Sequence, residues 1–549
     1  MADKVIINVN SKEYEVPVGM NLIDACALVG IEIPHFCYHP NLSIAGSCRL
    51  CLVQTGMPAL DPATREIIKE DDGSMRISWM PKPVIACATK VCQNLHVQTE
   101  NDLVKSCRSG ALEFFLANHP LDCPICDCAG ECKLQEYCNA YGRNDNRYIE
   151  EKNVKPKLTD IAGKIYLDNE RCVLCSRCIR ISKEILGKQY LSFTKRGSQT
   201  CVAAIEGENI DNNYIMNIVD NCPVGALTSK DFRFKMRTYF LKATNSISTE
   251  SSAGVNIKVW SRGKDIYRIT PNTNSQVNDC WTSDSSRMLY KVQNSEFRLK
   301  EARIDGTTCD TSYAVKRAGE ILGLGKVAII ASSRQTVEEQ FLTAKLVKDC
   351  KARVYLVSHL GEDDGFLVSA DRSPNMRGAF LNGLATEYPQ QDLLALREKV
   401  LVGEVETVLS FGENILSYGF EEKDLKSLNL IYCDCTENSL SHIAKIALPV
   451  KTVFEKAGSY INRQWRLQKF DVAVDADESV YSPIKLISQL IKEITNENFA
   501  DISLVDIRKM ILDELGIDIS KVDGQGLVLD SSKFADITFP EGKALHYDK

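Results

Sequence analysis

Alternating apolar and polar side chains at the start of the chain predict a β-hairpin. Residues 4–16 read Lys-Val-Ile-Ile-Asn-Val-Asn-Ser-Lys-Glu-Tyr-Glu-Val, with a polar Asn-Ser-Lys turn in the middle. Apolar positions at helical spacing then run from Leu22 to Val29 and stop at Gly30. Because glycine favours the left-handed conformation that ends many helices, this pattern predicts a short helix closed at Gly30.

Two further patterns appear in the second half of the chain. Strand-like alternation in Gly254–Trp260 and Asp265–Ile269 predicts a small β domain. From about residue 312 onward, short apolar runs alternate with helical stretches such as Thr336–Lys348, which predicts a parallel α/β domain. Neither Gly-x-Gly-x-x-Gly nor a Walker loop occurs, so the sequence does not support a nucleotide site of those types. The apolar runs are Val327–Ala331, Val354–Val357, Val408–Phe411 and Leu430–Cys433.

Length and composition indicate a globular protein of several domains. At 549 residues the chain is long enough for three to five domains, and 44% hydrophobic with 25% charged residues is ordinary for a soluble protein. No apolar run approaches the roughly 18 to 20 residues that span a bilayer, so we expect membrane contact only through partners. A net charge of −7 argues against a general nucleic-acid surface. The start of the chain lacks signal-peptide and transit-peptide features, which favours the reducing cytosol.

The cysteines change this picture because they are concentrated in one part of the chain. Of 22 cysteines, 17 lie in residues 1–230 and five in the remainder. A secreted disulfide scaffold is usually short and carries an export signal. Dense cysteine in a long chain without one therefore indicates metal binding.

The first ligand set combines a cysteine loop with one distant cysteine. Plant-type ferredoxins hold a 2Fe-2S cluster in this way, and hairpin, helix and cysteine loop is the element order of a β-grasp ferredoxin. Gly46 suits a loop that wraps closely around a cluster. The alternative is buried free cysteine, which we prefer for Cys26 and Cys92. The first set is Cys37, Cys48, Cys51 and Cys87.

The second set includes a histidine. A neutral imidazole can replace one thiolate as a metal ligand, which makes the site less negative and should raise its reduction potential. The spacing alone leaves open a structural zinc site built from three cysteines and one histidine. Cys128 and Cys138 are additional, and Cys128 complicates the choice of ligands. The second set is His119, Cys123, Cys126 and Cys132.

The third set is the most specific. A Cys-x2-Cys-x2-Cys triplet supplies three corners of a 4Fe-4S cubane, and a distant Cys-Pro supplies the fourth. In two-cluster ferredoxins the Cys-Pro follows the triplet by three residues, whereas only Ile-Arg-Ile-Ser follows Cys178. This segment should therefore hold one cubane. The third set is Cys172, Cys175, Cys178 and Cys222.

Basic side chains near the three sets can tune reduction potentials or dock a partner. Such charges are more often solvated rim residues, and that is what we expect for most of them. They are Arg49, Lys133, Arg171, Arg177 and Arg180.

The order of these motifs resembles a known family. A ferredoxin loop, then His-Pro-Leu-Asp-Cys-Pro-Ile-Cys, then Arg-Cys-Val-Leu-Cys-Ser-Arg-Cys-Ile-Arg and Asn-Cys-Pro-Val-Gly-Ala-Leu-Thr are similar to the large iron–sulfur subunit of NADH-quinone oxidoreductase, respiratory complex I. The resemblance implies one 2Fe-2S cluster on the first set. It implies a His-ligated 4Fe-4S cluster on the second set and an all-Cys 4Fe-4S cluster on the third.

The resemblance extends to the C-terminal half. That half looks like a molybdopterin oxidoreductase domain without its cofactor, and Phe454-Glu-Lys-Ala-Gly-Ser-Tyr-Ile-Asn462 is similar to a motif of that superfamily. Some bacterial members carry a further cubane just after the third set. Serine and valine cannot replace thiolates, so we expect no fourth cluster and an ordinary role for Cys280. The positions concerned are Ser248, Ser251, Val255 and Ser283.

These patterns, together with what the resemblance implies, predict a multidomain α+β and α/β protein. The expected domains are a β-grasp 2Fe-2S ferredoxin-type domain (1–88), a 4Fe-4S domain with one histidine and three cysteine ligands (89–145), a 4Fe-4S ferredoxin-like domain with four cysteine ligands (163–235), a degenerate 4Fe-4S molybdopterin-oxidoreductase-type small domain without cluster (240–310) and a molybdopterin-oxidoreductase-like α/β domain (311–549).

The function implied by the resemblance is electron relay rather than catalysis, and no catalytic residues are assigned. Electrons would come from a flavin-bearing NADH-oxidising subunit and pass with other iron–sulfur subunits of the peripheral arm toward quinone. The expected location is the cytoplasmic side of the bacterial inner membrane, without nucleic-acid partners. Two alternatives are the relay of an NAD-linked hydrogenase or formate dehydrogenase, and a zinc-stabilised interaction scaffold.

Overall fold

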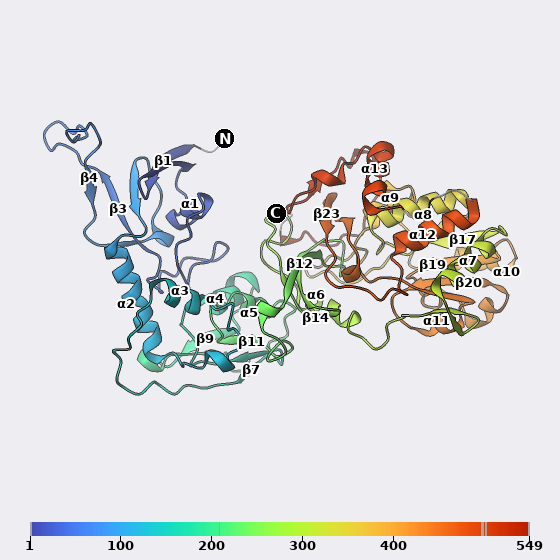
Figure 1. Cartoon of the computed structure of the whole chain (residues 1–549), viewed down its shortest axis with the longest axis horizontal. Coiled ribbons are helices and arrows are strands. Elements are labelled where there is room, and N and C mark those ends of the chain that lie inside the picture. The colour runs from blue at the N-terminus through green and yellow to red at the C-terminus, as the bar shows by residue number, and fades with distance from the viewer. Residues whose placement is uncertain (1–2, 208, 496–498, 500–501, 547–549) are drawn as a thin grey trace. The chain divides into compact units, whose positions relative to one another are not determined.

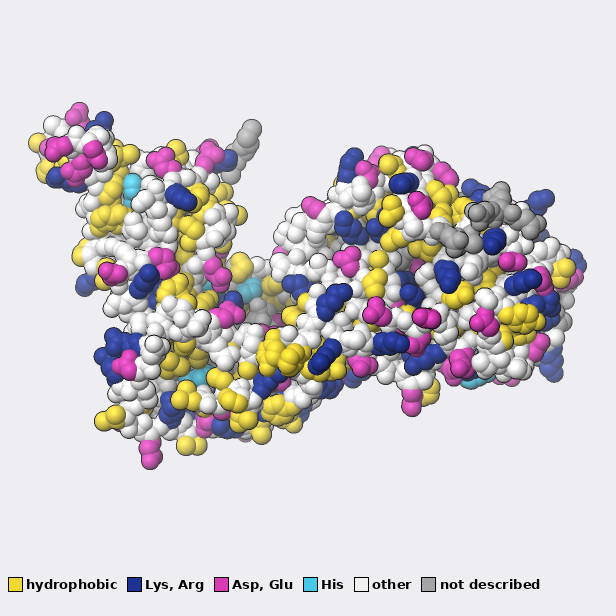
Figure 2. All heavy atoms as spheres, viewed as in Figure 1, with side chains coloured by type: hydrophobic (Ala, Val, Ile, Leu, Met, Phe, Trp, Pro, Cys, Tyr) yellow, Lys and Arg dark blue, Asp and Glu magenta, His cyan; other side chains and the backbone are white. Residues whose placement is uncertain are grey.

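The chain folds, in a computed structural model, into two compact units, Met1–Tyr239 and Phe240–Lys549 (Figure 1). The structure describes residues 3–207, 209–495, 499 and 502–546. Within those residues, no helix is long and apolar enough to cross a membrane. Acidic and basic side chains are interspersed over the visible face of each unit (Figure 2).

The first unit begins with a six-stranded sheet. Its strands are β1 (Lys4–Val9), β2 (Lys12–Pro17), β3 (Leu52–Pro58), β4 (Ile77–Trp79), β5 (Val84–Ile85) and β6 (Leu95–Gln98). β1 and β2 form the predicted hairpin, with Asn10 and Ser11 at positive φ in its tight turn. β1 also pairs in parallel with β6, and the order is β2-β1-β6-β3-β4 with β5 on β3.

The predicted first helix is α1 (Leu22–Leu28), and Gly30 beyond it adopts φ +79° as expected. α1 buries Leu22 and Cys26 in one core with Ile7 and Val9 of the sheet. Cys26 is therefore an ordinary core residue, as the sequence indicated.

Two helices frame the second ligand set. α2 (Asp102–Asn118) begins at Asn101, whose side chain accepts a backbone N–H of the first turn. α2 ends at Asn118 because the next residue, His119, precedes a proline and is extended. α3 (Lys133–Tyr141) begins directly after Cys132, so the second set occupies the connection between the two helices.

Short strands and helices hold the third set. The pairing of β8 with β11 places the chain that follows Cys222 beside the chain that precedes Cys172. The remaining pair, β9 and β10, forms an antiparallel hairpin. The elements are β7 (Thr159–Ile161), β8 (Ile165–Leu167), α4 (Arg177–Arg180), β9 (Leu191–Thr194), β10 (Cys201–Ala204), α5 (Asn217–Asp220) and β11 (Leu227–Ser229).

The second unit opens with the small β sheet that the alternating pattern predicted. β12 (Lys242–Ile247), β13 (Asn256–Arg262) and β14 (Asp265–Pro271) pair antiparallel in chain order. α6 (Asp284–Arg287) follows, and the side chain of Ser283 caps it by accepting the Ser286 N–H.

A seven-stranded sheet forms the core of the second unit and confirms the predicted α/β pattern. Its order is β16-β15-β21-β20-β19-β17-β18, and the strands from β21 to β18 run parallel. Successive residues of one strand pack into different hydrophobic cores: Ile329 packs with α7, α8 and α12, whereas Ile330 packs with α10 and α11. Because neighbouring side chains on a strand point to opposite faces, helices cover both faces. The elements are β15 (Ala302–Ile304), β16 (Thr307–Cys309), α7 (Thr311–Leu322), β17 (Val327–Ile330), α8 (Val337–Asp349), β18 (Arg353–Tyr355), α10 (Leu394–Leu401), β19 (Thr407–Phe411), β20 (Asn429–Asp434), α11 (Ser439–Ile443), β21 (Ile446–Pro449) and α12 (Pro483–Thr495).

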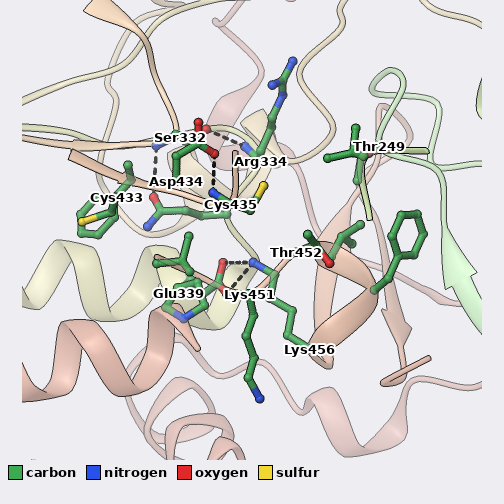
Figure 3. A pocket seen from close by; sticks show the side chains of 18 of the residues that line it. Thr249, Ser332, Arg334, Glu339, Cys433, Asp434, Cys435, Lys451, Thr452 and Lys456 are labelled. Carbon is green, nitrogen blue, oxygen red and sulfur yellow. Dashed lines mark hydrogen bonds and ion pairs between the residues drawn. The ribbon is translucent and has the colours of Figure 1, made fainter. Parts of the chain in front are cut away.

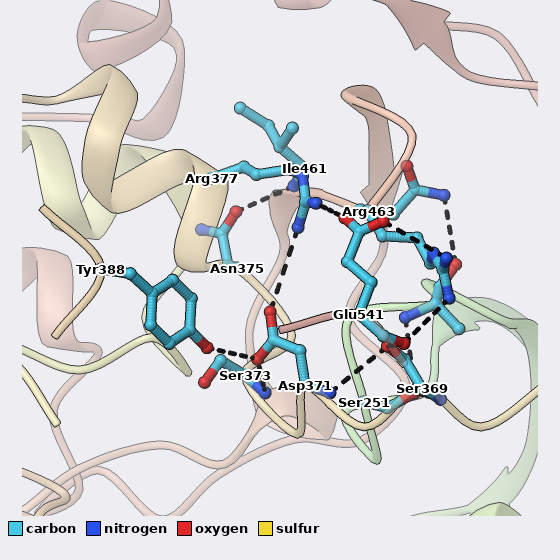
Figure 4. Close-up of polar contacts among 12 residues, drawn as sticks. Ser251, Ser369, Asp371, Ser373, Asn375, Arg377, Tyr388, Ile461, Arg463 and Glu541 are labelled. Carbon is cyan, nitrogen blue, oxygen red and sulfur yellow. Dashed lines mark hydrogen bonds and ion pairs between the residues drawn. The ribbon is translucent and has the colours of Figure 1, made fainter. Parts of the chain in front are cut away.

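Ion pairs fix the C-terminal segment onto this unit. The carboxylate of Glu541 pairs with the buried guanidinium of Arg377 and lies 3.2 Å from Arg463, and Asp371 lies 4.0 Å from Arg377 (Figure 4). The ring of Phe539 packs 4.1 Å from the Arg377 guanidinium. The remaining elements are α9 (Met376–Leu381), β22 (Gly458–Ile461), β23 (Arg466–Phe470), α13 (Leu504–Leu515) and β24 (Leu527–Val528).

Candidate metal centres

The structure brings the four cysteines of the first set together in the interior. Cys51 directly precedes β3 and Cys87 follows β5, and the antiparallel pairing of these strands joins their ends. The Sγ atoms of Cys51 and Cys87 are 3.5 Å apart, and the thiols of Cys37 and Cys48 are hydrogen-bonded. All four side chains are buried. Sheet pairing thus closes the long gap that separates Cys87 from the loop.

Hydrogen bonding favours the thiolate that metal binding requires in this set. The thiol of Cys48 donates to Cys37 and lowers the pKa of Cys37 to about 5, although burial opposes the shift. The pKa of Cys48 is raised by the same bond and by burial. Gly46 adopts φ +62°, a conformation that favours glycine, and an added Cβ there would lie 3.2 Å from the Ile85 side chain.

The four side chains of the second set line one cavity of about 140 Å³. Cys138 lines it too, while Cys128 does not, so Cys126 is the member of that pair that faces the cavity. Burial lowers the pKa of His119 to about 4, which leaves its imidazole neutral with a free nitrogen lone pair at pH 7. The arrangement meets the requirement of a site with one histidine and three cysteine ligands.

Two residues next to the second set have roles that motif reasoning did not assign. The thiol of Cys128 donates to Cys132 and lowers the pKa of Cys132 to about 7, so Cys128 supports a neighbour. Gly225 lies so close that an added Cβ would be 2.3 Å from the Cys126 Sγ. The only sequence signal for Gly225 is its place in the Cys-Pro-Val-Gly run.

The cysteines of the third set line a smaller cavity of about 20 Å³, together with apolar side chains such as Leu167 and Val224. Leu174 and Ser176, between the triplet cysteines, adopt positive φ, which curls the loop around the cavity. Burial raises the pKa of Cys172 and of Cys222 to about 12. A metal must therefore displace protons from these thiols as it binds.

The expectation that nearby basic residues are solvated is wrong for two of them. Arg171 is 4% exposed, and its Nη2 lies 2.6 Å from the carboxylate of Asp122 beside the second set. Arg180 is also buried. Arg49 is exposed, as expected. Burial of a guanidinium depends on packing from distant segments, which residue type and spacing do not encode.

The positions considered for a fourth cluster are occupied by a polar network. The hydroxyl of Ser251 accepts the Ser369 N–H at 3.3 Å (Figure 4). The hydroxyls of Ser248 and Ser286 are 2.6 Å apart, and Ser283 donates to Glu250 at 2.5 Å. Over the described residues, no three or more His, Cys, Asp or Glu side chains are grouped so as to hold a single metal ion.

A further cavity of about 400 Å³ lies in the second unit at the carboxyl ends of β17, β19 and β20 (Figure 3). Its walls include Cys433 and Cys435, and Lys456 there is paired with Glu339 at 2.6 Å. Burial raises the pKa of Cys435 to about 12 and that of Cys433 further, so both remain protonated thiols at neutral pH.

Four family models match the chain. The three ligand sets fall within the first three models, which confirms a 2Fe-2S-type N-terminal domain followed by 4Fe-4S domains. The models are a 2Fe-2S iron-sulfur cluster binding domain (2–102), the NADH-ubiquinone oxidoreductase-G iron-sulfur binding region (108–147), the ferredoxin-like domain of NADH-quinone oxidoreductase subunit 3 (162–228) and the NADH-ubiquinone oxidoreductase NDSU1/NuoG-like 4Fe-4S domain (241–291).

Curated relatives of this chain are also named as subunits of NADH-quinone or NADH-ubiquinone oxidoreductases. The NADH-quinone oxidoreductase G subunit of Rickettsia felis is 36% identical over 359 residues, covering 64% of this chain and 50% of the relative. The NADH-ubiquinone oxidoreductase 75 kDa subunit of Reclinomonas americana is 35% identical over 368 residues, covering 64% and 49%. The chain thus spans about half the length of these relatives.

One solved structure, an NAD+-reducing [NiFe]-hydrogenase in the H2-reduced state, matches at 25% identity and covers 43% of this chain and 91% of its own. Its TM-score of 0.34 is too low to establish a shared fold. The similarity described next therefore rests on the family models and the curated relatives. In the part that they match, this chain is similar to the large iron–sulfur subunit, the 75 kDa subunit, of NADH-quinone oxidoreductases.

Proposed function

We propose that the first unit is an electron relay that holds one 2Fe-2S cluster on the first set and one 4Fe-4S cluster on each of the other two. The observation that carries this proposal is the geometry of the second and third sets. In each of these sets, the four candidate ligand residues line one cavity. An iron–sulfur cluster in such a cavity would be bound by ligands around the cavity wall, whereas a single metal ion would require the ligand atoms to converge on one point.

The residues also provide the surroundings that a redox centre needs. When bound, iron–sulfur clusters accept and release single electrons, with potentials set by ligands, hydrogen bonds and burial. The chain supplies thiolates, apolar walls and, at the second set, one neutral imidazole in place of a thiolate. That imidazole makes the second centre less negative than the third and should raise its potential.

The homology supports a place for this relay in NADH:quinone oxidoreduction. We propose that the chain takes electrons from a flavin-bearing NADH-oxidising subunit and passes them with other iron–sulfur subunits toward quinone. It would act as a peripheral subunit on the cytoplasmic side of a bacterial inner membrane. In this assignment the chain has no catalytic residue of its own, because it moves electrons and transforms no substrate.

We further propose that the second unit has an α/β domain of the molybdopterin-oxidoreductase type, and that it holds neither a fourth cluster nor a molybdopterin cofactor. Three of the four positions considered for the fourth cluster are serines whose hydroxyls form hydrogen bonds within the chain, and the fourth is Val255. Molybdenum analysis and pterin fluorescence of the purified chain test this point; stoichiometric molybdenum would contradict it.

Metal analysis with electron paramagnetic resonance tests the relay. Anaerobically purified protein should be brown and contain about ten iron atoms, two from a 2Fe-2S and four from each 4Fe-4S cluster. Cys175→Ser should remove one cubane signal and spare the 2Fe-2S signal. Cys201→Ser, a buried cysteine of the same segment outside every set, should change none. A colourless protein with stoichiometric zinc would refute the relay.

A further inference from the structure

A single arginine contacts two ligand sets at once. Arg180 lies on α4, two residues after the last cysteine of the triplet, and only 9% of it is exposed. Its Nη2 donates to the backbone carbonyl of Cys37 at 2.5 Å and to that of Cys175 at 3.2 Å. Its Nη1 donates to the carbonyl of Ser43 at 2.5 Å. One guanidinium therefore joins a ligand residue of the first set to a ligand residue of the third.

Arg177 makes a second connection between the same two segments. Its guanidinium donates to the carbonyl of Tyr38, which follows Cys37 in the chain, and to that of Asn221 at 3.3 Å, which precedes Cys222. Glu184 adds a third connection, because it accepts the Ser43 N–H at 2.8 Å. The loop of the first set is thus fixed against the third set from several directions.

Neither guanidinium is neutralised by a carboxylate. Through the described part of the chain, no Asp or Glu lies within ion-pair distance of Arg177 or Arg180, while Arg171, Arg298 and Arg377 each have at least one carboxylate partner. A buried charge without a counter-charge is costly. Thiolate-ligated clusters carry negative charge, and the carbonyl bonds place both arginines next to two of them. The proposed centres supply the missing counter-charge.

We propose that Arg180, assisted by Arg177, is a positioning residue shared by the first and third centres: it fixes their ligand loops against each other and supplies positive charge that raises both reduction potentials. The inference rests on the proposed clusters of the first and third sets. Each added electron increases the negative charge of a centre, so a nearby cation stabilises the reduced state of both. The second centre has its own buried arginine, Arg171, and should not depend on Arg180.

The test is a redox titration of the intact, anaerobically purified chain, monitored by electron paramagnetic resonance. In Arg180→Gln the reduction equilibrium constants of the 2Fe-2S centre and the all-Cys cubane should each fall at least tenfold, which is 59 mV for one electron. The His-ligated cubane should stay unchanged. Arg49→Gln is the matched control, because it removes an exposed charge adjacent to Cys48 and should leave all potentials in place.

The outcomes separate this inference from the relay itself. If Arg180→Gln retains all three centres with unchanged potentials, or shifts only one of the two, the inference is wrong while the relay stands. If Arg180→Gln assembles incompletely, loss of the first and third centres together supports the inference, and loss of one alone contradicts it. If no centre assembles, Arg180→Lys decides, because one ammonium cannot replace the guanidinium fork. In Arg180→Lys, the reduction potentials of the first and third centres must then both shift. A shift of only one of them, or of neither, overturns the inference.

Discussion

Substitution of Gly225 should remove the His-ligated centre selectively. Gly225 follows Cys222-Pro223-Val224, so it belongs by sequence to the third set. In the fold it packs against the second set: an added Cβ would lie 2.3 Å from the Cys126 Sγ and 3.0 Å from the Cys128 Cβ. In Gly225→Ala the new methyl group therefore competes for the space of a proposed ligand atom.

The size of the effect follows from these distances. Ordinary contact between carbon and its neighbours begins near 3.5 Å, so the Cys126 sulfur must retreat by about 1 Å. A free side chain could rotate away, but a sulfur bonded to a cluster cannot. Overpacking of this kind costs about 1–3 kcal/mol, and about 1.4 kcal/mol is a tenfold change in an equilibrium constant. We expect the equilibrium constant for binding of the second centre to fall by about 5- to 150-fold.

Iron content and electron paramagnetic resonance of the purified variant measure this loss. Gly225→Ala should lose the signal of the His-ligated cubane and about four iron atoms, and it should keep the 2Fe-2S signal. Gly110→Ala is the control, because Gly110 lies in α2 with no atom near its added Cβ and a helical φ. That change should stabilise the helix by about 0.5–1 kcal/mol. Retention of the second cubane with native shape and potential in Gly225→Ala would refute the packing argument.

Three other variants test particular contacts. Cys126→Ala should abolish the second cubane, whereas Cys128→Ala should retain it, because of these two cysteines only Cys126 lines the cavity. Equal losses of iron in the two variants would contradict the assignment. His119→Cys should lower the potential of that cubane, since a thiolate adds negative charge; an unchanged potential and signal shape would show that His119 is no ligand. Arg298→Met should destabilise the second unit by about 3–5 kcal/mol in thermal or denaturant unfolding, because it strands the buried carboxylate of Glu455, 2.8 Å away. Joint replacement of Arg298 and Glu455 by apolar residues should recover most of that loss.

Local signals in the sequence were sufficient for the elements and for the grouping of ligands. Polar residues between two alternating runs predicted the hairpin of β1 and β2, because that alternation suits strands with one buried face. Short apolar runs that alternate with helical stretches predicted the parallel strands of the second unit. The tight spacing of Cys172, Cys175 and Cys178 predicted one site, and the fold places all three on one cavity. Secondary structure and the grouping of closely spaced cysteines depend on residues that are near one another in the sequence.

Only the tertiary structure decided which side chains meet across long distances. It showed that strand pairing brings Cys87, which the sequence had already assigned to the first set, to that loop, and it brought Gly225 against the second set. It also buried Arg180, which its residue type had marked as a solvated charge. The physical reason is that a sequence pattern records the conformation and average polarity of each position. Burial, cavity walls and the counter-charge of a guanidinium depend on segments that lie far away along the chain, and folding alone brings them into contact.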